Sequence, residues 1–182
     1  MGKKILILNG SPRPKGNTAG LIKTFTEGAE KAGHSVTTFL IDKMNIKGCK
    51  SCYKGGKDPQ SPCVQKDDME KIYPEFNKAD IVVFASPMYY WGFSGQIKIV
   101  LDRLFATFEI TNVPPKKEAI LLMAAGDKGE YNNKPVVDYF NAMLERLGWD
   151  NKGIVIAEEV IHLGDIKNNP ALEEARKLGE SL

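Results

Sequence analysis

The chain has 182 residues, of which 42% are hydrophobic and 26% are charged, and its 25 basic and 23 acidic residues give a formal net charge of +2. This length suits one domain with a full hydrophobic core, so we expect a single domain spanning residues 1–182. The near-balance of charge gives no electrostatic reason to expect a nucleic-acid or membrane partner, and no apolar run reaches membrane-spanning length.

Short apolar runs alternate with amphipathic stretches along the chain. Strands are predicted at residues 3–8, 35–41, 80–85, 118–125 and 151–157. Helices are predicted at about 18–32, from 67, from a cap at Ser94, at about 134–147 and at 170–182. The apolar runs are nearly continuous, as expected when helices cover both faces of a sheet. The sequence therefore predicts an α/β fold with an open, mostly parallel, doubly wound sheet.

Three predicted loops follow strands directly, at residues 10–18, 87–94 and 126–131. In open α/β sheets, ligands bind outside the carboxyl ends of the strands, where the strand order reverses. We therefore expect these three loops to form the functional site.

The first loop has chemistry that suits an anion. Its polar side chains are Ser11, Arg13, Lys15, Asn17 and Thr18, and no carboxylate occurs from residue 9 to residue 26. The free N–H groups and partial positive charge of a following helix would also favour a phosphate. The loop lacks both the Walker and the dinucleotide-binding patterns. An ordinary helix cap at Asn17 or Thr18 is the alternative interpretation.

The second loop is unusually aromatic, because four of the seven residues from Pro87 to Phe93 are Tyr, Trp or Phe. Such side chains can sandwich a flat conjugated ring, and Gly92 would allow the backbone to approach it. Together with a phosphate loop one strand away, this favours a mononucleotide cofactor, and a flavin rather than an adenine. Alternatively, the aromatic residues pack a dimer interface or cover the end of the core, and a flavin site at an interface would satisfy both interpretations.

Four segments resemble the NADPH-dependent FMN reductase family of flavodoxin-like proteins, near its iron–sulfur flavoprotein branch. They are Asn9–Arg13, Gly16–Thr18, Ser86–Gly92 and Leu101–Leu104, and the resemblance extends along nearly the whole chain. It implies a flavodoxin-like five-stranded parallel sheet of strand order 2-1-3-4-5, bound FMN and frequent dimerisation.

The resemblance also implies a set of cofactor-binding residues. Ser11, Arg13, Asn17 and Thr18 would hold the FMN phosphate. Pro87, Met88, Tyr89, Tyr90 and Trp91 would line the isoalloxazine ring. Gly126, in the third loop, would close the far side of the ring.

The three cysteines all lie within residues 49–63, in an irregular stretch after the second strand. Cys49 and Cys52 form a C-x-x-C pair, but Gly55 stands where the iron–sulfur branch has its next cysteine. We therefore expect free thiols and no metal, although three thiolates with an outside ligand, or a metal shared across a dimer, remain alternatives. An odd number of clustered cysteines favours a reducing cytoplasm over a secreted disulfide scaffold.

The predicted function is that of a cytoplasmic flavin oxidoreductase. Bound FMN would accept a hydride from NAD(P)H and pass electrons to a quinone, free flavin, ferric or similar acceptor. Because the cofactor carries this chemistry, no residue is assigned a catalytic role. An FMN-binding electron carrier without NAD(P)H activity and a cluster-assisted flavoprotein are the alternatives, and exposed aromatic residues favour a homodimer or higher homo-oligomer.

Overall fold

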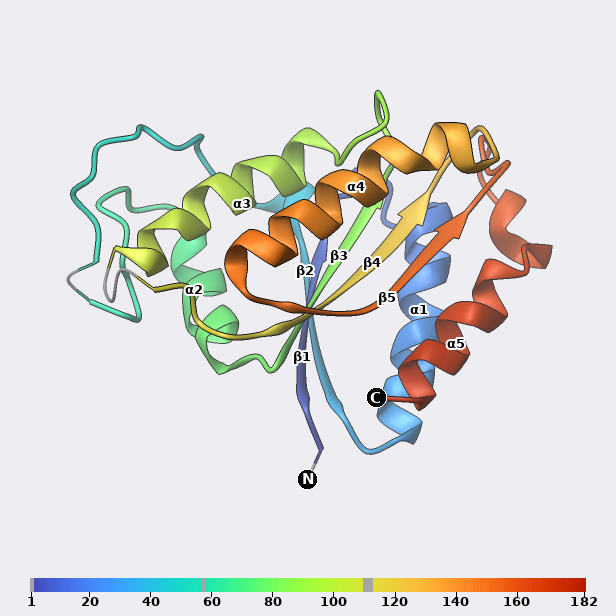
Figure 1. Cartoon of the computed structure of the whole chain (residues 1–182), viewed down its shortest axis with the longest axis horizontal. Helices are drawn as coiled ribbons and strands as arrows, with labels where there is room; N and C mark the ends of the chain where they lie inside the picture. The colour runs from blue at the N-terminus through green and yellow to red at the C-terminus, as the bar shows by residue number, and fades with distance from the viewer. Residues whose placement is uncertain (1, 57, 110–112) are drawn as a thin grey trace.

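A five-stranded sheet forms the centre of the protein, and the computed structural model describes residues 2–56, 58–109 and 113–182. The strand order is β2-β1-β3-β4-β5, and each neighbouring pair is parallel. The strands are β1 (Lys4–Asn9), β2 (Ser35–Leu40), β3 (Ile81–Pro87), β4 (Glu118–Ala124) and β5 (Asp150–Ala157). This order confirms the predicted flavodoxin-like α/β fold (Figure 1).

Helices cover both faces of the sheet. They are α1 (Asn17–Lys31), α2 (Met69–Lys78), α3 (Gly95–Phe108), α4 (Glu130–Leu147) and α5 (Ala171–Glu180). Alternate residues of β1 belong to two separate hydrophobic cores. Leu6 and Leu8 pack with α2, α3 and α4, whereas Ile5 and Ile7 pack with α1 and α5. Figure 1 shows α1 and α5 side by side on one face of the sheet, with α3 and α4 across the other. Among the described residues, no helix combines the length and hydropathy that a membrane crossing requires.

The helix predicted from residue 134 begins earlier, at Glu130. The sequence prediction placed the residues before Lys134 outside the helix. Instead, Gly129 takes a φ of 93° directly before the helix, and the carboxylate of Glu158 accepts hydrogen bonds from the Gly129 amide and the Asn133 side chain. This long-range contact fixes the first turn of α4, and local sequence does not reveal it.

A buried ion pair fastens the cysteine-containing segment to α3. The Arg103 side chain is fully buried, and its two terminal nitrogens lie 2.6 and 3.0 Å from the Asp67 carboxylate. The same guanidinium donates to the carbonyl oxygens of Lys47, at 2.7 Å, and Gln65, at 3.4 Å. Both ends of the segment between these two residues are therefore tied to one side chain.

Lys117 is a second buried charge, at the opposite edge of the sheet from the loops that follow the strands. Its ammonium group donates to the carbonyl oxygen of Ala79 at 2.6 Å and lies 4.8 Å from the centroid of the Phe76 ring. Burial lowers the pKa of Lys117 to about 8, and the nearby Asp80 only partly opposes this shift.

The Lys117 pKa predicts a pH-dependent stability. From about pH 8 to its ordinary pKa of 10.5, the unfolded chain holds a proton on Lys117 that the native protein has lost. Stability must therefore rise with pH across this window, by roughly 1–3 kcal/mol. Urea unfolding of the native protein and of Lys117→Met across this range measures the effect. Equal pH dependence in the two proteins would contradict it.

Candidate functional site

The three predicted loops meet at one cavity of about 200 Å³ at the carboxyl edge of the sheet. Its lining includes seven of the ten predicted site residues: Ser11, Arg13, Asn17, Pro87, Met88, Tyr89 and Gly126. Tyr90 and Trp91 line a neighbouring cavity of about 300 Å³, which shares Met88 and Tyr89 with the first. Thr18 is buried and lines neither cavity. The structure thus gathers nine of the ten residues around two adjoining hollows.

The first loop owes its path to a backbone bond to β3 and to close packing against the start of α3. The Gly10 amide donates to the Ala85 carbonyl at 2.8 Å, and a side-chain Cβ at Gly10 would lie 2.4 Å from both Ser94 Oγ and Ile97 Cγ1. Only glycine fits here. The Ser11 amide then donates to Asn9 Oδ1, and Ser11 Oγ accepts from the Arg13 amide at 3.2 Å. These bonds fold the loop back toward the start of α1.

The amino terminus of α1 has no side-chain cap. Gly16 is the N-cap residue, and no acidic residue lies in the first turn. The alternative interpretation, a helix cap formed by Asn17 or Thr18, is therefore wrong. An uncapped first turn leaves backbone N–H groups and a partial positive charge beside the cavity that Ser11 and Arg13 line. This arrangement suits a bound anion.

Asn17 faces the cavity but uses its side chain to hold another segment. Its Nδ2 donates to the His162 carbonyl at 3.0 Å, and its Oδ1 accepts from the Ile166 amide at 3.4 Å. The side-chain carboxylate of Asp165 accepts from the Ile161 and His162 amides. Asn17 therefore positions the segment between β5 and α5, which contributes Val160 and Ile161 to the cavity.

The aromatic loop forms a tight hairpin at the end of β3. Tyr89 and Gly92 exchange two backbone hydrogen bonds of 3.1 Å, so Tyr90 and Trp91 occupy the two central positions of the turn. Both have positive φ, 47° and 58°, as a type I′ turn requires. Bulky residues are uncommon in this conformation, which costs of order 1–3 kcal/mol each and occurs mostly at functional sites. Such a turn also leaves its two central N–H groups without a partner within the turn.

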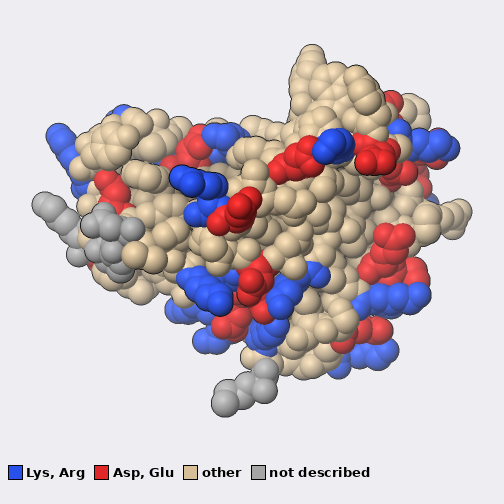
Figure 2. All heavy atoms as spheres, in the orientation of Figure 1, with Lys and Arg blue, Asp and Glu red and all other residues tan. Residues whose placement is uncertain are grey.

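This hairpin projects from the molecule as an uncharged surface. Tyr90 is 95% exposed, and Tyr89 and Trp91 are each 49% exposed. In Figure 1 the green loop after β3 extends beyond α3 and α4, and Figure 2 shows an uncharged projection in the same place. Large aromatic side chains exposed together in this way indicate a binding surface.

The third loop is joined to the segment between β5 and α5, which also lines the cavity. The Val160 amide donates to the Ala125 carbonyl at 3.0 Å, and Glu158 accepts from Gly129, as described above. A Cβ at Gly126 would approach Ile161 Cγ1 to 3.3 Å, so this glycine allows the two loops to pack closely. The contribution of Val160 and Ile161 was missed by sequence reasoning, although their position after the last strand provided a signal.

The strongest pKa shifts lie away from these two cavities. Burial raises the pKa of the Tyr73 phenol, whose oxygen donates to the Arg103 carbonyl in the core at 2.9 Å. Asp42, in the short 3-10 helix after β2, has its pKa lowered chiefly by hydrogen bonding to Lys43, and its carboxylate also accepts a hydrogen bond from Gln96. Asp42 therefore has protein partners for its carboxylate and lines neither cavity.

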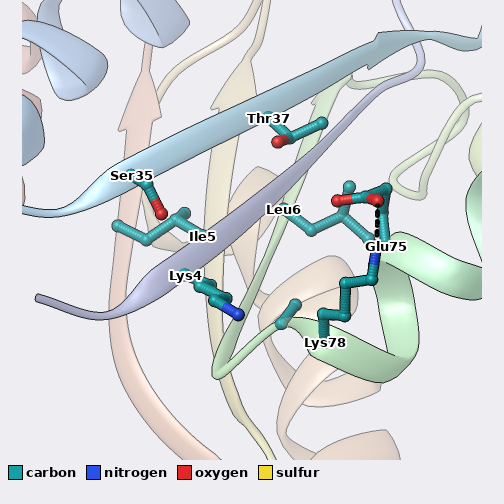
Figure 3. A pocket seen from close by; sticks show the side chains of 8 residues that line it. Lys4, Ile5, Leu6, Ser35, Thr37, Glu75 and Lys78 are labelled. Atoms are coloured by element: carbon teal, nitrogen blue, oxygen red, sulfur yellow. Dashed lines mark hydrogen bonds and ion pairs between the residues drawn. The ribbon is translucent and has the colours of Figure 1, made fainter.

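Another cavity, of about 210 Å³, lies at the amino ends of β1 and β2 (Figure 3). Figure 3 shows Glu75 and Lys78 of α2 pointing toward each other beside it, and their charged atoms lie 2.9 Å apart. Because ligands of doubly wound sheets bind at the carboxyl ends of the strands, this cavity lies at the wrong edge for the predicted site.

The three cysteines line a small cavity of about 30 Å³ together with Tyr53 and Phe105. All three thiols are free, Cys49 and Cys52 are exposed, and Ser51 and Tyr53 beside Cys52 have positive φ values of 49° and 48°. Among the residues that the structure describes, no group of three or more His, Cys, Asp or Glu side chains is placed to hold a metal ion.

The fold and the strand order define a flavodoxin-like protein with its candidate site at the carboxyl edge of the sheet. The chain belongs to the NADPH-dependent FMN reductase family, whose model matches residues 3–169. This is a family of FMN-binding, NAD(P)H-dependent flavin oxidoreductases.

Individual relatives agree with this assignment. The chain is 28% identical over 171 residues to an iron-sulfur flavoprotein of Methanosarcina thermophila. This alignment covers 94% of this chain and 85% of the relative. It is also 28% identical over 186 residues to YwqN of Bacillus subtilis, described as an NAD(P)H-dependent FMN-containing oxidoreductase. This alignment covers 96% of each chain. The solved NAD(P)H:quinone oxidoreductase from Methanothermobacter marburgensis has a TM-score of 0.76 at 18% identity and covers 100% of this chain and 97% of its own, which supports the fold.

Proposed function

We propose that this protein binds FMN and transfers electrons from NAD(P)H through FMN to a quinone, free flavin, ferric or similar acceptor. One observation carries the proposal: an uncapped helix terminus with Ser11 and Arg13 adjoins a hollow lined by Tyr89, Tyr90 and Trp91. The family membership supports the same cofactor. On this proposal, residues 1–182 act as one FMN-binding domain.

The donors at the first loop fit a phosphate. Ser11 and Arg13 line the cavity beside the uncapped first turn of α1, so a phosphate there would receive charged and neutral hydrogen bonds. Asn17 would act by fixing the loop wall and its own backbone, because its side chain already has two partners. Thr18 would contribute through its backbone, since it is buried outside the cavity.

The aromatic hairpin fits a flat ring. Met88 lies between the two cavities, where it would separate the phosphate end from the ring end, and Pro87 and Gly126 line the side toward the sheet. The N–H groups of Tyr90 and Trp91, free within the turn, would be available to the polar edge of the ring. Preorganised backbone dipoles of this kind stabilise developing negative charge at low reorganisation cost.

The cofactor supplies hydride acceptance and electron transfer when it is bound. The protein's own residues bind it, orient it and exclude water from one of its faces. Hydride transfer requires no side chain to accept or donate a proton. In agreement with this, Tyr73 and Lys117, whose pKa values are strongly shifted, lie outside the candidate site.

An absorbance spectrum tests the cofactor assignment directly. We expect flavin bands in the protein as purified, or after incubation with FMN and desalting, and oxidation of NADPH or NADH when a quinone or ferric acceptor is added. A flavin-containing protein without turnover would instead be an electron carrier. A protein that cannot be loaded with FMN would overturn the proposal.

Replacing Arg13 with alanine is expected to weaken FMN binding by about 1.5–3 kcal/mol, the usual contribution of a charged hydrogen bond. Fluorescence titration of FMN into the apoprotein measures this loss. Arg146→Ala, on the exposed surface of α4, is the matched control and should leave the affinity unchanged. Equal FMN affinity in Arg13→Ala and the native protein would remove Arg13 from the phosphate site.

We also propose that the protein forms a homodimer or higher homo-oligomer and acts in the cytoplasm. The exposed hairpin of Tyr89, Tyr90 and Trp91 supports the first, because a second copy covering it would remove a large aromatic surface from water. The three free thiols support a reducing compartment.

A further inference from the structure

A separate groove of about 620 Å³ lies on the outer side of the first loop. The loop residues Pro14, Lys15 and Gly16 form one wall, and the first two turns of α1 form the floor. The segment from Leu163 to Lys167, between β5 and α5, forms the opposite wall. This volume lies within the usual range for pockets that bind small molecules and cofactors.

The groove combines a positive rim with an apolar floor. Three lysines line it, Lys15, Lys23 and Lys167, and no carboxylate does. Lys23 lies 3.6 Å from Glu27. Within the described part of the chain, Lys15 and Lys167 have no ion pair, so both charges are available to a ligand.

The floor of the groove is apolar. Ala19 and Gly20 of α1 supply this floor, and Ile166 of the opposite wall packs closely against Gly20, where an added Cβ would lie 3.0 Å from the Ile166 side chain. A lone inorganic anion would leave most of this volume and all of the apolar floor unused. The groove therefore favours a ligand that has both a ring system and anionic groups.

The groove adjoins the candidate FMN site. Gly16 lines both the groove and the cavity that contains Ser11 and Arg13. The partition between them is the segment after β5, whose residues Val160 and Ile161 face the cavity and whose residues Leu163 to Lys167 face the groove. Asn17 holds this partition through its bonds to His162 and Ile166. A ligand bound in the groove could thus extend over the shared rim toward FMN held in the cavity.

We propose that this groove binds the 2′-phosphorylated adenosine end of NADPH, with Lys15 and Lys167 contacting the phosphates and the adenine lying on the apolar floor. This inference rests on the proposed function, since it assigns the site of the electron donor. It makes these two lysines specificity-determining residues, because the 2′-phosphate is the only group that distinguishes NADPH from NADH. Lysine is a common ligand for phosphate as a compact point charge.

Calorimetric titration tests the groove without turnover. The protein is saturated with FMN and titrated with adenosine 2′,5′-bisphosphate and, separately, with AMP. We expect the bisphosphate to bind at least tenfold more tightly than AMP, and the double variant Lys15→Gln/Lys167→Gln to lose at least tenfold in bisphosphate affinity. Lys71→Gln/Lys177→Gln removes the same charge from exposed positions on α2 and α5, and it should bind within twofold of the native protein.

Two results would overturn the inference. One is bisphosphate binding that the double variant retains. The other is bisphosphate binding that rising FMN concentration abolishes, because the ligand would then occupy the phosphate end of the flavin site.

A kinetic ratio separates this inference from the proposed function. The ratio of kcat/KM for NADPH to that for NADH should fall at least tenfold in the double variant and stay unchanged in the control. An unchanged ratio in a protein that turns over both nucleotides would overturn the groove assignment alone. Absence of turnover with both nucleotides in the native, FMN-loaded protein would overturn the proposed function, and the titration would still decide whether the groove binds the bisphosphate.

Discussion

Replacing Asp67 with alanine is expected to lower the free energy of unfolding by about 3–5 kcal/mol, because it leaves the buried Arg103 guanidinium without its counter-charge. The side chains of Arg103 and Asp67 are 0% and 2% exposed. Asp67 also accepts hydrogen bonds from the Lys47 and Met69 amides, which would lose their acceptor. Urea unfolding measures the loss.

A neighbouring carboxylate provides the control for this prediction. Asp102 pairs with Lys98 on the exposed surface of α3, and Asp102→Ala should change stability by less than about 1 kcal/mol. Replacing both buried partners, as Asp67→Leu/Arg103→Met, should recover much of the loss, since apolar residues often substitute for a buried pair at little cost. A double variant as unstable as Asp67→Ala would mean that the packing around the pair, rather than the orphaned charge, dominates.

The same pair predicts a loss of stability in acid. Burial alone would raise the pKa of Asp67, but the hydrogen bonds from Arg103 and from the Lys47 and Met69 amides hold it below its ordinary value of 3.8. Because the folded pKa is depressed, the stabilisation is present above the ordinary value and is lost as pH falls through the folded pKa.

The fold could be predicted because its signals are local. The apolar runs at β1, β3 and β4 and the cap at Ser94 are visible in the sequence, and the structure confirms them. The start of α4 was not predictable, because it depends on Glu158, which is distant in the chain.

The site was only partly predictable for the same reason. Loop position and residue type brought Arg13, Met88 and Gly126 to one cavity, as the rule for parallel sheets predicts. The side-chain direction of Asn17 could not be predicted, because its partners, His162 and Ile166, follow the last strand. The groove beside that segment was missed entirely, since Lys167 is far in sequence from Lys15 and Lys23.

The strained aromatic hairpin leads to the second large prediction, in which stability and binding change in opposite directions. We expect Tyr90→Asn/Trp91→Gly to raise the free energy of unfolding by about 1–3 kcal/mol, because Asn-Gly is the preferred pair for a type I′ turn. The same variant should weaken FMN binding by roughly 10- to 100-fold, since it removes the aromatic wall that would stack on the ring.

Tyr131→Asn is the control, because this tyrosine is 86% exposed on α4 and lines neither cavity of the site. It should alter neither unfolding nor FMN affinity appreciably. Sedimentation of the hairpin variant also tests the proposed homo-oligomer, which should dissociate if Tyr90 and Trp91 lie at its interface.

The opposite signs are what make the hairpin experiment decisive. If Tyr90 and Trp91 were needed for folding, replacing them would destabilise the protein. Their positive φ values of 47° and 58° are adopted at lower cost by Asn and Gly, so replacement is expected to stabilise the protein instead. If the variant folds more stably and still binds FMN as tightly as the native protein, the aromatic wall has no part in the flavin site. If it folds more stably and loses FMN, the strain at this turn is retained because the aromatic side chains bind the ring.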